Sequence, residues 1–164
     1  MVGKVDVSIW ELRAVGFLAG LAEAGHDPAG VLRLRPGDCH AADGERVGVQ
    51  LLESSLPLPG AVFCQSDELA FGLIASLRRA GVQCPRDISV AGFDDHPMAR
   101  LWDLTTVDQH AHAQGVRAAQ ALLDLVGDTA SGEPPPAVSI DRLRVQLIIR
   151  DSTARISAAD ITFR

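Results

Sequence analysis

The sequence is poor in the features that mark nucleic-acid-binding and membrane-spanning proteins. It carries a net charge of −6, Lys4 is its only lysine, and its arginines are scattered among acidic residues, so no basic patch would hold nucleic acid. No apolar run approaches the roughly 18 residues that a membrane span needs, so we expect no contact with a membrane.

Cysteine is scarce as well. The three cysteines are an odd number without a Cys-x-x-Cys spacing, which argues against a disulfide scaffold and against a zinc knuckle. Residues 1–16 contain no long apolar segment followed by small residues, so we expect no signal peptide. Both observations favour a reducing compartment, and we predict a cytoplasmic protein.

The sequence does contain enough apolar material for one folded domain, because 47 % of its 164 residues are hydrophobic. The first clear pattern is helical and covers residues 11–24. There Leu12, Val15, Ala19 and Ala22 recur at the spacing of one helix face, and Leu18 and Leu21 widen that face, which predicts a helix.

Two weaker elements follow. Residues 31–35 alternate between apolar and basic side chains, which is typical of a half-buried strand. Residues 41–53 have helical spacing, but Gly44 and Gly48 inside the segment are expected to weaken this second helix.

The clearest unit is residues 61–95, which read as a strand, a helix and a second strand. Ser66 or Asp67 suits the N-cap of the helix, and Gly81 suits its end. The second strand is apolar with little alternation, as expected for a strand covered on both faces. Strand, helix and strand at this spacing predict a right-handed parallel crossover.

The remaining segments repeat these element types. Residues 104–109 form a short β-rich run, 111–126 have helical spacing, 127–136 read as a loop, and 138–153 contain one or two late strands. The predicted fold class is therefore α/β, with a mostly parallel sheet flanked by helices.

Polar residues follow three of the predicted strands. Ser66 and Asp67 follow the first, Asp94 and Asp95 follow the second, and Gln109 follows the third. Ligands of such sheets bind beyond the carboxyl ends of the strands. We therefore predict that these polar groups surround one crevice.

Residues 61–109 also resemble a known family. An apolar strand is followed by SDELAFG, then by a helix ending in AG, then by PRDISVAGFDD, and then by LTTVDQ. In this order the segments closely resemble the effector-binding domain of lactose-repressor-type transcription regulators. A weaker likeness continues upstream through LRAVGFLAGLAEAG and downstream through RLRVQLIIRDST.

The resemblance implies a fold similar to that of periplasmic sugar-binding proteins, in which two α/β subdomains close on a small molecule. The likeness falls in the second subdomain, so we expect a truncated fragment without the helix-turn-helix head. Residues 1–110 and 138–153 would form that effector-binding subdomain, 111–126 a helix belonging to the absent first subdomain, and 154–164 a tail.

The resemblance also implies effector contacts. Arg13 matches an arginine that binds sugar hydroxyls or a carboxylate, and Asp94 matches an acid that accepts hydrogen bonds from the ligand. Ser66 stands where the family has Asn or Asp, and its alternative role is that of a helix N-cap. Cys39 stands where the family often has an aromatic residue that stacks on the ligand. Because cysteine cannot stack, the ligand is expected to be small or bound in another way. Gln109 matches a polar contact at the crossover.

The same resemblance implies a homodimer whose operator DNA is bound only through the absent head. Five residues match positions that pack across the two-fold axis of the family. The predicted interface residues are Phe71, Ile74, Met98, Leu101 and Trp102.

Other functions have weaker support in the residues. Asp94 and Asp95 could bind Mg²⁺ in a phosphotransfer or receiver domain, but Lys4 lies outside the patterned region where such sites need a lysine. His110 and His112 have no further ligand at a fixed spacing, so no zinc is expected. We predict a sugar-like effector, no cofactor, no catalytic residue and no enzyme; the alternative from a related class is a fragment of a periplasmic-type sugar-binding protein.

Overall fold

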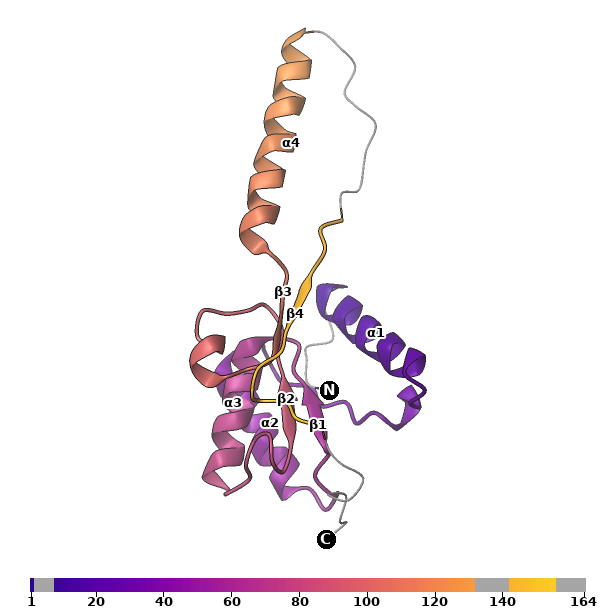
Figure 1. The fold of residues 1–164 in the computed structure, drawn as a ribbon, viewed down its shortest axis with the longest axis vertical. Coiled ribbons are helices and arrows are strands. Elements are labelled where there is room, and N and C mark those ends of the chain that lie inside the picture. Colours follow the sequence, from indigo (N-terminus) through magenta and orange to yellow (C-terminus); the bar gives the residue numbers. More distant parts are fainter. Residues whose placement is uncertain (2–7, 132–141, 156–164) are drawn as a thin grey trace. The chain divides into compact units, whose positions relative to one another are not determined.

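The computed structural model of the chain describes residue 1, residues 8–131 and residues 142–155. These residues fall into two compact units (Figure 1). The first runs from Met1 to Val107 and resumes at Leu147, and the second is Asp108–Gln146.

Two parallel strands and the helix between them form the centre of the first unit. Strand β1 (Ala61–Phe63) pairs with β2 (Ser89–Ala91) in parallel, with Val62 opposite Val90. Helix α3 (Asp67–Arg79) connects them, and a parallel bridge joins Ala91 to Thr105. The predicted α/β class with parallel strands is confirmed.

Helix α3 begins and ends as its sequence predicts. The Ser66 hydroxyl accepts a hydrogen bond from the Leu69 amide, which makes Ser66 rather than Asp67 the N-cap. Gly81 has a φ of 79°, a left-handed conformation that glycine adopts at low cost after a helix. One face of α3 is fully buried through Leu69, Leu73 and Leu77.

Helix α2 (Ala41–Glu53) packs closely on α3, and glycines make this contact feasible. A Cβ atom on Gly44 would collide with the backbone of Leu69, and one on Gly72 would collide with the Ala41 carbonyl. The prediction that glycines only weaken this helix was therefore incomplete, because they also remove the side chains that would separate α2 from α3.

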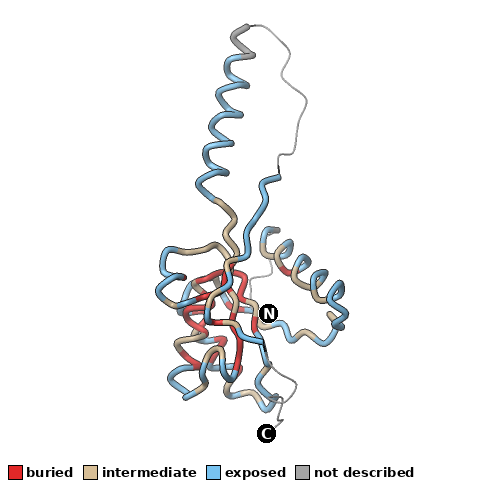
Figure 2. Tube along the Cα trace, in the orientation of Figure 1, coloured by how far each residue is buried: buried red, intermediate tan, exposed pale blue. Residues whose placement is uncertain are grey.

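The apolar core lies between these helices and the parallel strands (Figure 2). Ser152, which follows β4 (Gln146–Ile148), is buried beside the sheet. Its hydroxyl donates to the Val90 carbonyl at 2.6 Å and accepts from the Thr105 amide at 2.7 Å. The end of the described chain therefore stabilises the link between β2 and the segment that follows it.

Helix α1 (Ser8–Glu23) agrees with the predicted helix; most of its apolar face is exposed, while Leu18 and Leu21 are half-buried. Leu12 is 70 % exposed and Val15 is 57 % exposed, whereas Ala14 is buried and Phe17 is half-buried. The apolar residues of α1 are spread around the helix, so spacing alone did not identify the covered side. Of the strand predicted at 31–35, the described structure contains only a single β-bridge residue, Leu34.

Two short 3₁₀ helices complete the first unit, η1 (Pro28–Gly30) and η2 (Ala99–Trp102). Strand β3 (Thr106–Asp108) pairs with β4. These two short strands lie where the chain passes between the two units.

The second unit is dominated by helix α4 (Ala111–Ser131). The helix includes residues 127–131, which we predicted to belong to a loop. Its apolar side chains are exposed, among them Leu122 at 62 % and Leu123 at 70 % (Figure 2). Residues 138–141 of the predicted late strands lie outside the described residues. Among those that are described, no helix is long and apolar enough to cross a membrane.

Candidate functional site

Arg13 of α1 and Asp94, which follows β2, form an ion pair. Arg13 Nη2 donates to Asp94 Oδ1 at 2.7 Å, and Arg13 Nη1 donates to the carbonyl of Gln65 at 2.6 Å. The Arg13 side chain is only 9 % exposed and that of Asp94 is 32 % exposed. Two of the predicted site residues, 81 positions apart in the chain, therefore meet at the carboxyl ends of β1 and β2.

Two aromatic rings flank the arginine. The guanidinium carbon of Arg13 lies 4.8 Å from the centre of the Trp10 ring and 4.0 Å from that of Phe93. A cation over aromatic faces is attracted by their negative quadrupole. The rings therefore hold the guanidinium in one orientation. Neither ring was predicted from the sequence as part of the site, although Trp10 lies one helical turn before Arg13.

Asp94 has a strained backbone conformation in addition to its ion pair with Arg13. Its φ is 110°, in the left-handed half of the map that a side chain other than glycine rarely adopts. Burial raises the pKa of its carboxyl above the ordinary value of 3.8, and the nearby Arg13 charge only partly opposes that rise. The amide of Asp94 donates to the Val107 carbonyl at 3.0 Å, which fixes the turn against the next segment.

Gln65 was not predicted as a site residue, yet it contacts α1 twice. Its Nε2 donates to the Trp10 carbonyl at 2.8 Å, and its own carbonyl accepts from Arg13. The only signal for it in the sequence is its place directly before Ser66, at the end of the predicted strand.

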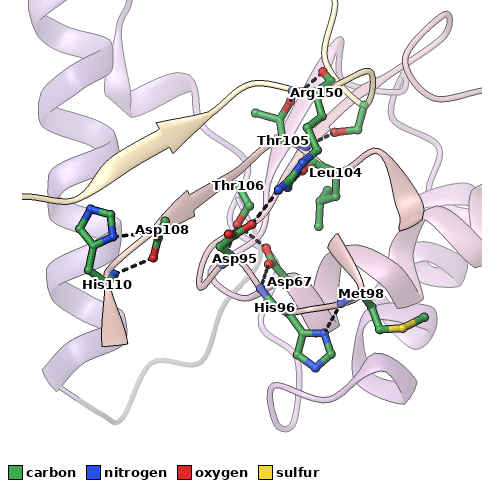
Figure 3. Close-up of polar contacts among 11 residues, drawn as sticks. Asp67, Asp95, His96, Met98, Leu104, Thr105, Thr106, Asp108, His110 and Arg150 are labelled. Atoms are coloured by element: carbon green, nitrogen blue, oxygen red, sulfur yellow. Dashed lines mark hydrogen bonds and ion pairs between the residues drawn. The ribbon is translucent and has the colours of Figure 1, made fainter. Parts of the chain in front are cut away.

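Asp67 links the start of α3 to two other segments of the chain (Figure 3). Its carboxylate accepts hydrogen bonds from Thr106 Oγ1 at 2.6 Å and from the His96 amide at 2.7 Å. Burial raises the pKa of Asp67, and the two hydrogen bonds oppose the rise. A Cβ atom on Gly92 would collide with this carboxylate, so only glycine fits there. The prediction of a capping role for Asp67 is replaced by a cross-linking one.

Asp95 pairs with a second arginine. Arg150 donates to Asp95 Oδ1 at 2.9 Å and to the Leu104 carbonyl at 2.6 Å (Figure 3). Since Asp94 and Asp95 each face a different arginine, the pair does not form the acidic cluster that Mg²⁺ needs. Within the described ranges, no group of three or more His, Cys, Asp or Glu residues is arranged to hold a metal ion.

Ser66 and Cys39 are in contact, and the contact joins the side chain of Ser66 to the backbone of Cys39. The buried Ser66 hydroxyl donates to the Cys39 carbonyl at 3.2 Å while it caps α3, so its hydrogen bonds are used within the fold. Cys39 is partly buried, and burial raises the pKa of its thiol, which keeps it protonated and weakly polar. Whether either residue contacts a ligand stays a prediction.

Gln109 belongs to the second unit, so its predicted convergence with Arg13 and Asp94 stays a prediction. Its carbonyl accepts a hydrogen bond from Gln114 Nε2 at 2.6 Å, at the start of α4. In the same unit, His110 Nδ1 lies 2.7 Å from Asp108 Oδ2 (Figure 3).

The five residues predicted to form a dimer interface have different surroundings. Phe71 is buried, and its ring centre lies 5.3 Å from that of the half-buried Trp102. Ile74 packs on the edge of the core. Met98 and Leu101 are exposed, Leu101 at 74 %. The exposed pair and the edge of Trp102 are thus the parts of the set available to a partner.

Comparison with known proteins decides the family. The sequence profile of the periplasmic binding protein-like domain matches residues 1–153. The chain belongs to this family. The predicted resemblance to lactose-repressor-type regulators is confirmed, since the periplasmic binding protein-like domain described here matches repressors of that type in sequence and in structure.

Among the curated relatives, the transcriptional repressor CytR of Escherichia coli K12 is 31 % identical over 157 residues, which are 93 % of this chain and 43 % of CytR. The regulator MalR of Streptomyces coelicolor is 40 % identical over 96 residues, which are 57 % of this chain and 26 % of MalR. The chain thus spans less than half the length of these relatives. They are transcriptional regulators, not enzymes.

Two solved structures show the same fold. A lac repressor dimer bound to operator and the anti-inducer ONPF has a TM-score of 0.78 at 26 % identity, over 94 % of this chain and 51 % of the repressor chain. A regulator of the same family from Enterococcus faecium with bound ribose has a TM-score of 0.74 at 29 % identity, over 88 % of this chain and 51 % of that one.

Proposed function

We propose that this periplasmic binding protein-like domain senses a small polar, sugar-like effector on behalf of a transcriptional regulator, and that it catalyses no reaction. The observation that carries the proposal is the ion pair of Arg13 and Asp94, oriented by two aromatic rings at the carboxyl ends of parallel strands. This is the place where ligands of such sheets bind.

The Arg13–Asp94 pair offers a sugar hydroxyl both a hydrogen-bond donor and a hydrogen-bond acceptor. A sugar hydroxyl both accepts and donates a hydrogen bond, so it can accept from a guanidinium N–H and donate to a carboxylate oxygen. Arg13 offers several N–H groups in one plane, and Trp10 and Phe93 fix that plane. The ribose bound by the Enterococcus faecium relative supports a ligand of this class.

In a full-length regulator, the effector would act by shifting the pose of two subdomains and hence of the DNA-binding heads. Such coupling between effector and operator is typically about 1–3 kcal/mol. Operator DNA would be bound by the head and not by this acidic chain. The relatives are transcriptional regulators, which supports action in the cytoplasm.

We also propose that the domain forms homodimers through the surface of Met98, Leu101 and Trp102. The support is the exposure of Met98 and Leu101 beside the half-buried Trp102, together with the dimeric state named for the lac repressor. An exposed apolar patch of this kind is typical of an interface.

The effector proposal is tested by titrating D-ribose into isotope-labelled protein and following amide chemical shifts. We expect saturable shifts at residues near Arg13 and Asp94, with weak affinity, because the family resemblance places the other half of the cleft on another subdomain. Asp94→Asn should abolish the shifts, while the exposed-site control Asp103→Asn should leave them unchanged. Equal shifts in both variants would contradict the proposed site, whereas micromolar binding by calorimetry would contradict only the expected weak affinity.

A further inference from the structure

Within the residues that the structure describes, helix α1, which carries Arg13, borders an apolar cavity with its later turns. The cavity has a volume of about 300 Å³ and is lined by apolar residues, among them Phe17 and Leu21 of α1 and Val62 and Phe63 of β1. Phe17 stacks on Phe63 with ring centres 4.9 Å apart. The α1 residues that line the cavity belong to its later turns, whereas the first turns, which carry Trp10 and Arg13, contact the described part of the unit through polar contacts and the Phe93 ring.

Those polar contacts converge on Gln65. This residue is only 2 % exposed, and it binds α1 through its side chain at the Trp10 carbonyl and through its backbone carbonyl at Arg13. Trp10 and Arg13 are three positions apart and therefore lie on the same side of the helix. One buried residue thus contacts two successive turns of α1.

We propose that Gln65 is a positioning residue, which fixes the first turns of α1 and thereby directs the Arg13 guanidinium toward Asp94. The proposal rests on the proposed effector site, because Gln65 acts on the ligand only through Arg13. It assigns a role to a residue that neither the sequence pattern nor the family resemblance indicated.

The side-chain oxygen of Gln65 favours a positioning role for this residue over a purely stabilising one. Gln65 Oε1 is buried and has no hydrogen-bond partner among the described residues. A buried acceptor without a partner destabilises a fold relative to an apolar group of the same shape. Methionine at this position would therefore keep or raise the stability while removing the contact with Trp10.

Tryptophan fluorescence can follow the position of α1 directly. The chain has two tryptophans, so Trp102→Phe leaves Trp10 as the only reporter. In that background, we expect Gln65→Met to raise the acrylamide quenching of Trp10 severalfold without lowering the melting temperature. The matched control Gln50→Met, the same change at an exposed position of α2, should alter neither.

A chemical rescue separates positioning from packing. In Gln65→Glu, the protonated carboxyl can donate to the Trp10 carbonyl, whereas the carboxylate cannot. Quenching of Trp10 should therefore fall back toward the parent value as the pH drops below the pKa of that carboxyl. Quenching that does not depend on pH would overturn the assignment, as would unchanged quenching in Gln65→Met.

The reciprocal background, Trp10→Phe, leaves Trp102 as the reporter of the core. If Gln65→Met raised the quenching of Trp102 as well and lowered the melting temperature, Gln65 would be an ordinary stabilising residue and the proposal would be wrong. A D-ribose titration separates the two proposals. Without ribose-dependent shifts in the parent protein the effector site fails, while the fluorescence result still decides the role of Gln65.

Discussion

Asp95 and Arg150, 55 positions apart in the chain, form an ion pair with 2.9 Å between Oδ1 and Nη2. The preceding residue, Asp94, pairs with Arg13 from α1. Two adjacent acids are thus held by arginines from opposite ends of the sequence. This arrangement fixes the turn after β2 from two sides, and it makes the pairings testable one at a time.

Removal of Arg150 should destabilise the first unit without touching Arg13. In Arg150→Met, the Asp95 carboxylate and the Leu104 carbonyl lose a donor. We expect a loss of about 1–3 kcal/mol in the free energy of unfolding, measured by urea denaturation. Arg86→Met, at a fully exposed arginine beside Asp87, should cause no measurable change. Equal stability of both variants would show that the Arg150 pair is not a stabilising contact.

The raised pKa of Asp94 predicts an unusual dependence of stability on pH. The folded chain holds this proton to a higher pH than the unfolded chain, in which the ordinary pKa is 3.8. Protonation therefore favours the folded state, and the contribution of Asp94 to stability falls as the pH rises from 3.8 through the folded pKa.

Asp94→Asn isolates this effect, because asparagine keeps an oxygen for Arg13 and has no proton to lose. Urea denaturation of both proteins over a series of pH values should show the parent losing stability relative to the variant across that window. A difference that stays constant with pH would mean that burial does not raise this pKa.

The close contact of α2 and α3 should be intolerant of a single methyl group. In Gly72→Ala, the added Cβ would meet the Ala41 carbonyl, so the helices must separate. We expect a loss of about 1–3 kcal/mol by chemical denaturation. Gly20→Ala in α1 meets nothing within 4 Å and should stabilise by up to ~1 kcal/mol through helix propensity. The free energy of unfolding should therefore fall in Gly72→Ala and rise in Gly20→Ala, although both replace glycine by alanine.

If the proposed dimer surface is correct, a charge placed within it should convert the dimer into a monomer. Leu101→Glu puts a charge on a side chain that is 74 % exposed, so it should disrupt association while leaving the fold intact. Sedimentation velocity should show a dimer for the parent and a monomer for the variant. Leu56→Glu, at another exposed leucine, is the control and should remain dimeric. A parent that is monomeric at all concentrations would refute the proposed interface.

Helix α4 should exchange its amide protons faster than α3. Its described side chains from Ala111 to Gly127 are all exposed, and an isolated helix has little stability in water. Hydrogen–deuterium exchange should therefore separate α4 from α3, whose apolar face is buried. Full protection of α4 in a monomeric sample would contradict this account, whereas protection in a dimer would place the exposed Leu122 and Leu123 against a second chain.

The two parallel strands and α3 between them were predicted well from the sequence. The residues that begin and end α3 have characteristic side chains or backbone conformations and lie close to the helix in the sequence. Ser66, the helix period of α3 and Gly81 fixed that helix to within a residue or two. The covered side of α1 could not be predicted, since apolar residues lie all round it and the choice depends on Phe63 and Gln65, more than forty positions away.

The family resemblance and the rule for strand ends predicted that Arg13 and Asp94 share one site, but neither predicted the ion pair between them or the residues around it. The roles of Gln65, Asp67 and Arg150 depend on hydrogen bonds to distant backbone atoms, and such contacts leave no pattern in the sequence. Gly92 shows the same limit, because only the position of the Asp67 carboxylate explains why a side chain cannot fit there.

The burial of Ser152 against Val90 and Thr105 has a consequence for biosynthesis. Chains begin to fold N-terminus first while they leave the ribosome. The parallel strands and α3 are available early, but the β2 turn gains Arg150 and Ser152 only when nearly the whole described chain has been translated. Translational pausing before codon 150 would therefore leave a nascent chain in which the turn after β2 still lacks its contacts with Arg150 and Ser152.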